Sequence, residues 1–117
     1  MSYNIQLYRK ETKEIQLNHP SEDFFENEEN LLPFTPQQKA SLTERLLQYE
    51  YIVEKEGEDE TTFINTNEEG ATALLTNRAL YFSASGEGIF EISMTASEFT
   101  DTGEYAKYDP QAGGWEE

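Results

Sequence analysis

The sequence predicts an α+β fold in which an antiparallel β-meander sheet packs against one or two helices as a two-layer sandwich. Three observations predict it. Residues Tyr3 to Leu7 alternate apolar and polar side chains with the two-residue period of a half-buried strand. Residues 36–49 carry leucines at helical spacing. After Tyr51, short runs rich in β-branched and aromatic residues alternate with turn residues, as in a meander.

The chain has 117 residues, which is within the range of one domain, and no Pro/Gly/Ser-rich linker divides it. We therefore expect a single domain, residues 1–117. Hydrophobic residues make up 36% and include seven Phe and seven Tyr, enough for a compact aromatic core. No run reaches the ~18 apolar residues of a membrane span, and Met1–Lys10 lacks the apolar core of a signal peptide. These features, with the absence of cysteine, predict a cytoplasmic protein away from membranes.

The segment after the first strand is less clearly patterned. Residues 11–17 could form a hairpin partner of the first strand or a helix, and the sequence leaves both open. Pro20–Asp23 resembles a helix start in which Ser21 caps free backbone N–H groups. A short helix carrying Phe24 and Phe25 would follow.

The best-marked helix begins after Phe34. Thr35 is a suitable N-cap, Pro36 fits the first helical position, and Gln38 stands where a capping box needs it. The expected core-facing stripe is Leu42, Leu46 and Tyr49, with Leu47 beside it.

The second half predicts five strands of an antiparallel meander. They are Tyr51–Lys55, Glu60–Thr66, Ala71–Thr76, Arg78–Ser83 and Gly88–Thr95. In the last of these, Phe90, Ile92 and Met94 would face the helix, and Glu91 and Ser93 the solvent. The tail from Glu104 to Glu117 holds three aromatic residues that either pin it across the sheet or form an exposed contact surface.

The stretch Asn65–Gly70, NTNEEG, resembles the first half of a calcium-binding EF-hand loop. A twelve-residue loop beginning at Asn65 would end at Thr76, where the bidentate glutamate is missing. It also lies between strand-like runs rather than helices. We therefore predict a hairpin turn with Gly70 at positive φ.

Charge gives the clearest functional signal. Eight Lys and Arg against 24 Asp and Glu give a net charge of −16, which repels nucleic acid and anionic lipid. Two stretches concentrate the acids, Glu22–Glu29 and Glu54–Glu60. Such runs are commonly solvated loops that keep a protein soluble. The alternative is that the two runs meet on one face and engage a basic partner.

Catalytic equipment is sparse. His19 is the only histidine and lies in a polar connection, so we interpret it as a loop residue. Without cysteine, zinc would need a carboxylate-dominated site, which it uses less readily. Gly86–Gly88 lacks the lysine of a phosphate-binding loop and is not expected to precede a helix, so we interpret it as a hairpin loop. We therefore predict a protein that is not an enzyme, with no catalytic residue, no cofactor and no metal.

The chain also resembles a known group. Three segments carry the resemblance: MSYNIQLYRK, FTPQQKASLTERLLQYEY and YDPQAGGWEE. They resemble small uncharacterised acidic bacterial proteins, some of them similar to immunity proteins that neutralise toxins. The resemblance implies a protein-binding module of the immunity or inhibitor type, whose acidic surface would cover the substrate site of a cationic toxin such as a nuclease.

We therefore expect a partner protein with a basic surface. The predicted partner-binding residues are Glu22, Asp23, Glu26, Glu28, Glu29, Glu56, Glu58, Asp59 and Trp115. The alternative is a small-molecule-binding or catalytic domain with a pocket between helix and sheet, for which Arg78, Tyr81 and Glu91 are candidates. A third possibility is a domain that acts only within a larger assembly.

Overall fold

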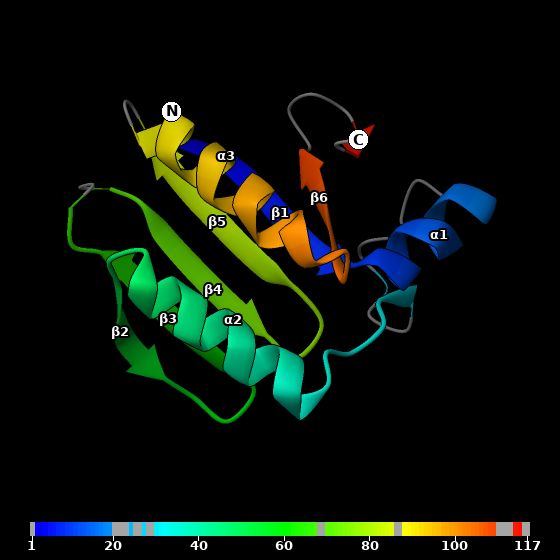
Figure 1. Ribbon diagram of the computed structural model, residues 1–117, viewed down its shortest axis with the longest axis horizontal. Coiled ribbons are helices and arrows are strands. Elements are labelled where there is room, and N and C mark those ends of the chain that lie inside the picture. Colours follow the sequence, from blue (N-terminus) through cyan, green and yellow to red (C-terminus); the bar gives the residue numbers. More distant parts are fainter. Residues whose placement is uncertain are drawn as a thin grey trace.

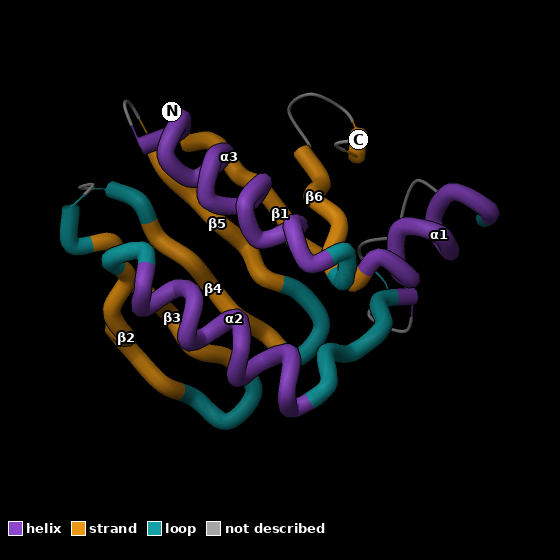
Figure 2. Tube along the Cα trace, viewed as in Figure 1, coloured by secondary structure: helices purple, strands orange, loops and turns teal. Residues whose placement is uncertain are grey.

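The computed structural model describes residues 2–19, 24, 27, 30–67, 70–85, 88–109 and 114–115. In these ranges an antiparallel sheet is combined with helices, which confirms the predicted α+β class (Figures 1 and 2). The strands are β1 (Ser2–Arg9), β2 (Tyr51–Glu56), β3 (Glu60–Asn65), β4 (Thr72–Thr76), β5 (Leu80–Ser85), β6 (Tyr105–Asp109) and β7 (Gly114–Trp115). The helices are α1 (Lys10–Asn18), α2 (Pro36–Gln48) and α3 (Gly88–Phe99), and a 3₁₀ turn (Thr100–Thr102) follows α3.

The strand order is β2-β3-β4-β5-β1-β6-β7. Strands β2 to β5 follow one another as the predicted meander. The N-terminal strand β1 then lies inside the sheet, because it pairs with β5 on one side and with β6 on the other. Within its pairing with β5, Ile5 lies opposite Phe82 and Leu7 opposite Leu80.

Helices α2 and α3 lie on the same face of the sheet, α2 over the β2–β4 side and α3 over β5 and β1 (Figure 1). This face holds the main core, and the two-layer sandwich is therefore as predicted. Alternating strand residues supply its sheet side, among them Phe63 and Phe82, and Leu42, Leu46 and Ile92 supply its helix side. Each fully buried large apolar side chain stabilises the fold by roughly 1.5–3 kcal/mol before ordering entropy is subtracted.

A smaller cluster lies on the opposite face, near α1. It consists of Tyr8, Phe24, Leu31 and Ala79, with Ile15, Tyr81, Tyr108 and Trp115 packed against it. The tail aromatics thus follow the first of the two alternatives. Tyr108 pairs with Gln6 of β1, and Trp115 lies across from Tyr108, so the described parts of the tail are pinned to the sheet.

The prediction of a strand at Gly88–Thr95 is wrong, because these residues begin helix α3. Phe90 and Met94, expected to face the core, are 72% and 47% exposed. The core side is instead formed by Ile92, Ala96 and Phe99, at helical spacings of four and three. Apolar residues at alternate positions also occur on helices, and packing on β5 and β1 decides in favour of the helix here.

The same helix corrects the interpretation of Gly86–Gly88 as a hairpin loop, because Gly88 is the first residue of α3. Gly86 and Glu87 lie outside the described residues. Residues 11–17 are helical, as part of α1, so the choice left open by the sequence is decided for the helix. The helix expected to start at Pro20–Asp23 falls outside the described residues, except that Phe24 is buried in the second cluster.

The described part of the turn between β3 and β4 has the predicted hairpin form. These strands are antiparallel partners, and Gly70 has a φ of 89°, as predicted for a hairpin turn. The Asn65 Oδ1 atom accepts a hydrogen bond from the Asn67 N–H at 2.8 Å, so the side chain shapes the turn itself.

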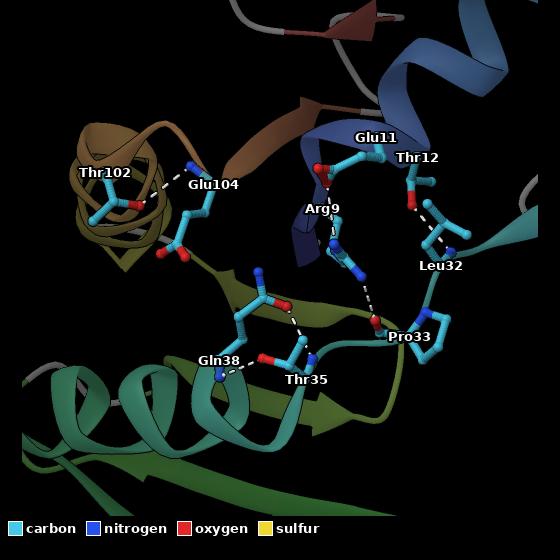
Figure 3. Close-up of polar contacts among 9 residues, drawn as sticks. All are labelled: Arg9, Glu11, Thr12, Leu32, Pro33, Thr35, Gln38, Thr102 and Glu104. Atoms are coloured by element: carbon cyan, nitrogen blue, oxygen red, sulfur yellow. Dashed lines mark hydrogen bonds and ion pairs between the residues drawn. The ribbon is translucent and has the colours of Figure 1, made fainter.

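The segment before α2 is held by polar contacts (Figure 3). Thr35 and Gln38 form the predicted capping box. The Thr35 Oγ1 atom accepts a hydrogen bond from the Gln38 N–H at 3.1 Å, and the Gln38 Oε1 atom accepts one from the Thr35 N–H at 2.9 Å. Arg9 donates to the Pro33 carbonyl at 3.0 Å, and Thr12 Oγ1 accepts from the Leu32 N–H. None of the helices in the described part of the chain is long and apolar enough to span a membrane.

Candidate functional site

The β2–β3 hairpin carries the second acidic stretch. Its five acids, all exposed, are Glu54, Glu56, Glu58, Asp59 and Glu60. The three predicted partner-binding residues among them, Glu56, Glu58 and Asp59, therefore lie together at the end of this hairpin. The five acids of the first acidic stretch lie outside the described residues. They are Glu22, Asp23, Glu26, Glu28 and Glu29.

Local chemistry gives the hairpin its shape. The Gly57 N–H donates to the Glu60 carbonyl at 2.7 Å, closing the turn. A Cβ atom at position 57 would lie 3.0 Å from that same carbonyl oxygen, so the close approach favours glycine. Asp59 accepts a hydrogen bond from the Asn77 amide at 3.4 Å, which links the turn to the β4–β5 connection. The acids thus sit on an ordered hairpin tied to a neighbouring turn.

Strand β2 forms one end of the sheet, since β3 is the one strand paired with it in the described part of the chain. Tyr51, its first residue, is buried under the helices, and every following residue of the strand is exposed. Ile52 is 46% exposed and Val53 is 42% exposed, although both are apolar. The β2–β3 register shifts between Val53 and Lys55, which marks a β-bulge. This edge therefore presents apolar side chains and carboxylates together.

The basic side chains are largely engaged elsewhere, and all eight lie within the described residues. Arg9 pairs with Glu11 at 3.4 Å and Arg45 with Asp101 at 2.9 Å. Three more basic side chains donate to carbonyl, amide or hydroxyl oxygens. Arg78 donates to the Leu31 carbonyl, Lys39 to the Asn77 amide, and buried Lys107 to Ser93 and Ser97.

The hairpin acids take no part in these ion pairs. Among the described residues, no ion pair involves Glu54, Glu56, Glu58, Asp59 or Glu60. The one basic side chain on the hairpin is Lys55. This excess of negative charge at one end of the sheet creates a field that attracts cationic surfaces.

Trp115 does not join the hairpin acids. It lies on β7, at the opposite end of the strand order from β2. Its ring packs edge-on against Tyr108 at 5.0 Å and Tyr8 at 5.9 Å, and its indole N–H donates to Gln16 Oε1 at 3.0 Å. These contacts give Trp115 a role in fastening the tail to α1 and the sheet. The apolar side chains that accompany the hairpin acids are Ile52 and Val53, which sequence reasoning did not single out.

The three pocket candidates do not gather in one place. Tyr81 lies on the sheet face away from α2 and α3, edge-on to Tyr8. Glu91 belongs to α3, on the helix-covered face. Arg78 lies in the β4–β5 connection and donates to the Leu31 carbonyl at 2.7 Å. A pocket between helix and sheet formed jointly by these residues is therefore not what the structure presents.

Other chemical groups are equally dispersed. His19 is exposed at the C-terminal end of α1, where its backbone N–H donates to the Ile15 carbonyl. Among the described residues, no three His, Asp or Glu side chains gather closely enough to hold a metal ion. The strongest pKa shifts belong to buried tyrosines: desolvation raises the pKa of Tyr8 the most and raises the pKa values of Tyr51 and Tyr105 to about 12. Tyr51 and Tyr105 lie in the main core.

Comparison of the chain with protein-family models, with curated proteins and with solved structures found no match.

Proposed function

We propose that this protein is a non-catalytic binding module that engages a basic protein through its β2–β3 hairpin. The observation that carries the proposal is the group of five exposed acids on this hairpin at one end of the sheet, without ion pairs to the described remainder of the chain. Opposite charges on a partner would steer association and fix orientation. Ile52 and Val53 would provide the apolar contacts within the acidic surround.

The inhibitor form of this proposal is the most specific. A toxin that acts on nucleic acid needs a basic substrate site, and an acidic hairpin is complementary to such a site. The bound module would then cover that site and exclude the substrate. This form follows the sequence resemblance to immunity proteins and adds the hairpin as the contacting surface.

The test compares two charge-reversed variants of equal net charge. The first replaces Glu56, Glu58 and Asp59 by Lys, and its matched control replaces Glu14, Glu44 and Glu98, which are also exposed. Proteins captured from the parent organism on immobilised wild type are identified, purified and titrated individually against the wild type and both variants. We expect a basic partner whose affinity falls more than about tenfold with the hairpin variant and changes little with the control.

Salt provides a second readout on the same complex. Because screening weakens interactions between exposed charges, the affinity for wild type should fall as ionic strength rises, and the hairpin variant should lose this dependence. Equal affinities for the two variants would show that the hairpin is not the binding surface and would overturn the proposal.

A further inference from the structure

We propose that the partner docks on β2 by strand addition: an extended, lysine- or arginine-rich segment pairs with the open edge and extends the sheet. This inference rests on the proposed function and names the mode of binding. Strand addition uses main-chain hydrogen bonds for affinity and alternate side chains for specificity.

The first requirement is an edge with unused backbone groups. The Thr66 N–H donates to the Glu50 carbonyl at 2.8 Å, which makes residues 50 and 66 a hydrogen-bonded pair of the β2–β3 ladder. In the same register Ile52 lies opposite Ile64, so these form the next bonded pair. Antiparallel ladders alternate bonded and non-bonded pairs, and Tyr51 and Val53 therefore direct their N–H and C=O groups away from β3.

The second requirement is side chains that an added strand can cover. Val53 lies opposite Phe63 and so shares the helix-covered face, whereas Ile52, one residue away, lies on the other face. Both are about half exposed, so an added strand would find an apolar contact on each face of the sheet. The carboxylates of Glu54 and Glu56 follow directly along the edge. The apolar residues at the start of β2 and the acidic residues after them are complementary to a partner segment that contains both apolar and basic residues.

The two ends of the sheet differ in how well they could accept a strand. Within the described residues, strand β7 comprises Gly114 and Trp115, and very short edge strands deter pairing. Strand β2 has six residues and no proline, so its outward groups remain usable up to the bulge after Val53.

Charge selects a basic segment over a second copy of this chain. Pairing of β2 with β2 of another copy would bring Glu54 and Glu56 of two molecules that each carry −16 close together, with Lys55 as the one basic residue of each strand. Like charges directly opposite destabilise a strand pair, whereas opposite charges stabilise it. The acids on this edge thus oppose self-association and favour a cationic strand.

The test uses a synthetic peptide of about twelve residues that alternates lysine and valine, long enough to pair with β2 from Tyr51 to Val53 and to reach past the acids that follow. Its twin carries the same side chains with alternate backbone nitrogens methylated, which keeps the charge and removes one row of N–H donors. We expect the methylated twin to bind at least about tenfold more weakly. Amide hydrogen exchange at Tyr51 and Val53 should slow when the unmethylated peptide binds.

Two substitutions at one position sharpen the test. Val53→Pro removes an outward N–H and leaves the Ile52–Ile64 pair intact, and proline is tolerated where an edge N–H faces solvent. Val53→Thr keeps the N–H. We expect Val53→Pro to weaken peptide binding about tenfold or more and Val53→Thr to change it less than about threefold.

The outcomes separate this inference from the proposed function. If the twin peptides bind equally, or the exchange of Tyr51 and Val53 stays unchanged on binding, strand addition is wrong, whether or not Val53→Pro folds. The proposed function survives that result if the Glu56, Glu58 and Asp59 charge reversal still abolishes partner binding. If the charge reversal has no effect on the captured partner, the proposed function fails as well.

Discussion

The helix-covered centre of the sheet and its β2 edge differ in burial. At the centre, Phe82 lies between Tyr51 and Phe99 with ring centroids 6.0 Å from each, and all three are buried. At the edge, every residue after Tyr51 is exposed. Burial of apolar side chains at the centre therefore stabilises the fold, whereas the exposed charges at the edge contribute little to its stability. Substitutions at the edge can accordingly test binding separately from folding.

The largest effect is expected from Phe82→Ala at the centre. Removing this ring leaves a cavity between β5 and the helices, and the free energy of unfolding should fall by about 3–5 kcal/mol. Urea unfolding followed by circular dichroism measures the loss. The control is Val53→Ala at the edge, which should change stability by less than about 0.5 kcal/mol. Equal losses at both positions would contradict the contrast between the two regions.

The buried tyrosines predict a loss of stability in alkali. Desolvation raises the pKa values of Tyr51 and Tyr105 to about 12, above the ordinary value of 10.0, and raises the pKa of Tyr8 as well. Below pH 10 both the folded and the unfolded tyrosines are protonated, so the free energy of unfolding is constant with respect to them. Between about pH 10 and 12 the unfolded state releases protons that the folded state keeps, and stability falls by roughly 2 kcal/mol per tyrosine.

Urea unfolding at a series of pH values measures this decline, and Tyr105→Phe is its control. The buried Tyr105 hydroxyl has no hydrogen-bond partner among the described residues, so its removal should leave neutral-pH stability unchanged or slightly higher. The variant should also show a shallower alkaline decline. A steeper decline in Tyr105→Phe would show that the raised pKa of Tyr105 does not contribute to the loss of stability in alkali.

A smaller effect is expected at the start of α2. Thr35→Ala removes the Oγ1 acceptor of the Gln38 N–H, and the free energy of unfolding should fall by about 1 kcal/mol. Ser41→Ala, at an exposed position inside the same helix, should differ from wild type by less than about 0.5 kcal/mol. Thermal unfolding of both variants checks the difference, and a larger loss for Ser41→Ala would be inconsistent with the cap.

The capping box also shows what sequence could predict. Thr35, Pro36 and Gln38 interact within one helical turn, so local chemistry specifies that helix start. The β3–β4 turn at Gly70 is local in the same sense, and its prediction is confirmed. The α+β class followed from such local signals taken together.

The predictions that failed concern features that depend on contacts between residues distant in the sequence. In α3, Ile92 and Phe90 suggested a strand over residues 88–95, and the helical spacing becomes visible only when Ala96 and Phe99 are included. No local pattern indicated that β1 would lie between β5 and β6, since those partners are far away in the sequence. For the site, the position of β2 at the end of the strand order was equally hidden, although its acids were evident.

The smallest expected effect on stability comes from reversing the hairpin charges. Glu56, Glu58 and Asp59 are exposed and unpaired by any described cation, so replacing all three by Lys removes no ion pair and only the long, exposed hydrogen bond from Asn77 to Asp59 at 3.4 Å. It lowers the magnitude of the net charge and so relieves repulsion, and stability should stay within about 0.5 kcal/mol of wild type or rise at low salt. Urea unfolding at two ionic strengths measures this.

A loss of more than about 1 kcal/mol would mean that the hairpin acids help to hold the fold, and binding defects of the variant could no longer be assigned to the surface. The control with Glu14, Glu44 and Glu98 replaced carries the same net charge, so any difference between the two variants reflects position alone. Preserved stability in both, with partner binding lost in only the hairpin variant, would separate the two regions: the centre folds the chain and the edge recognises its partner.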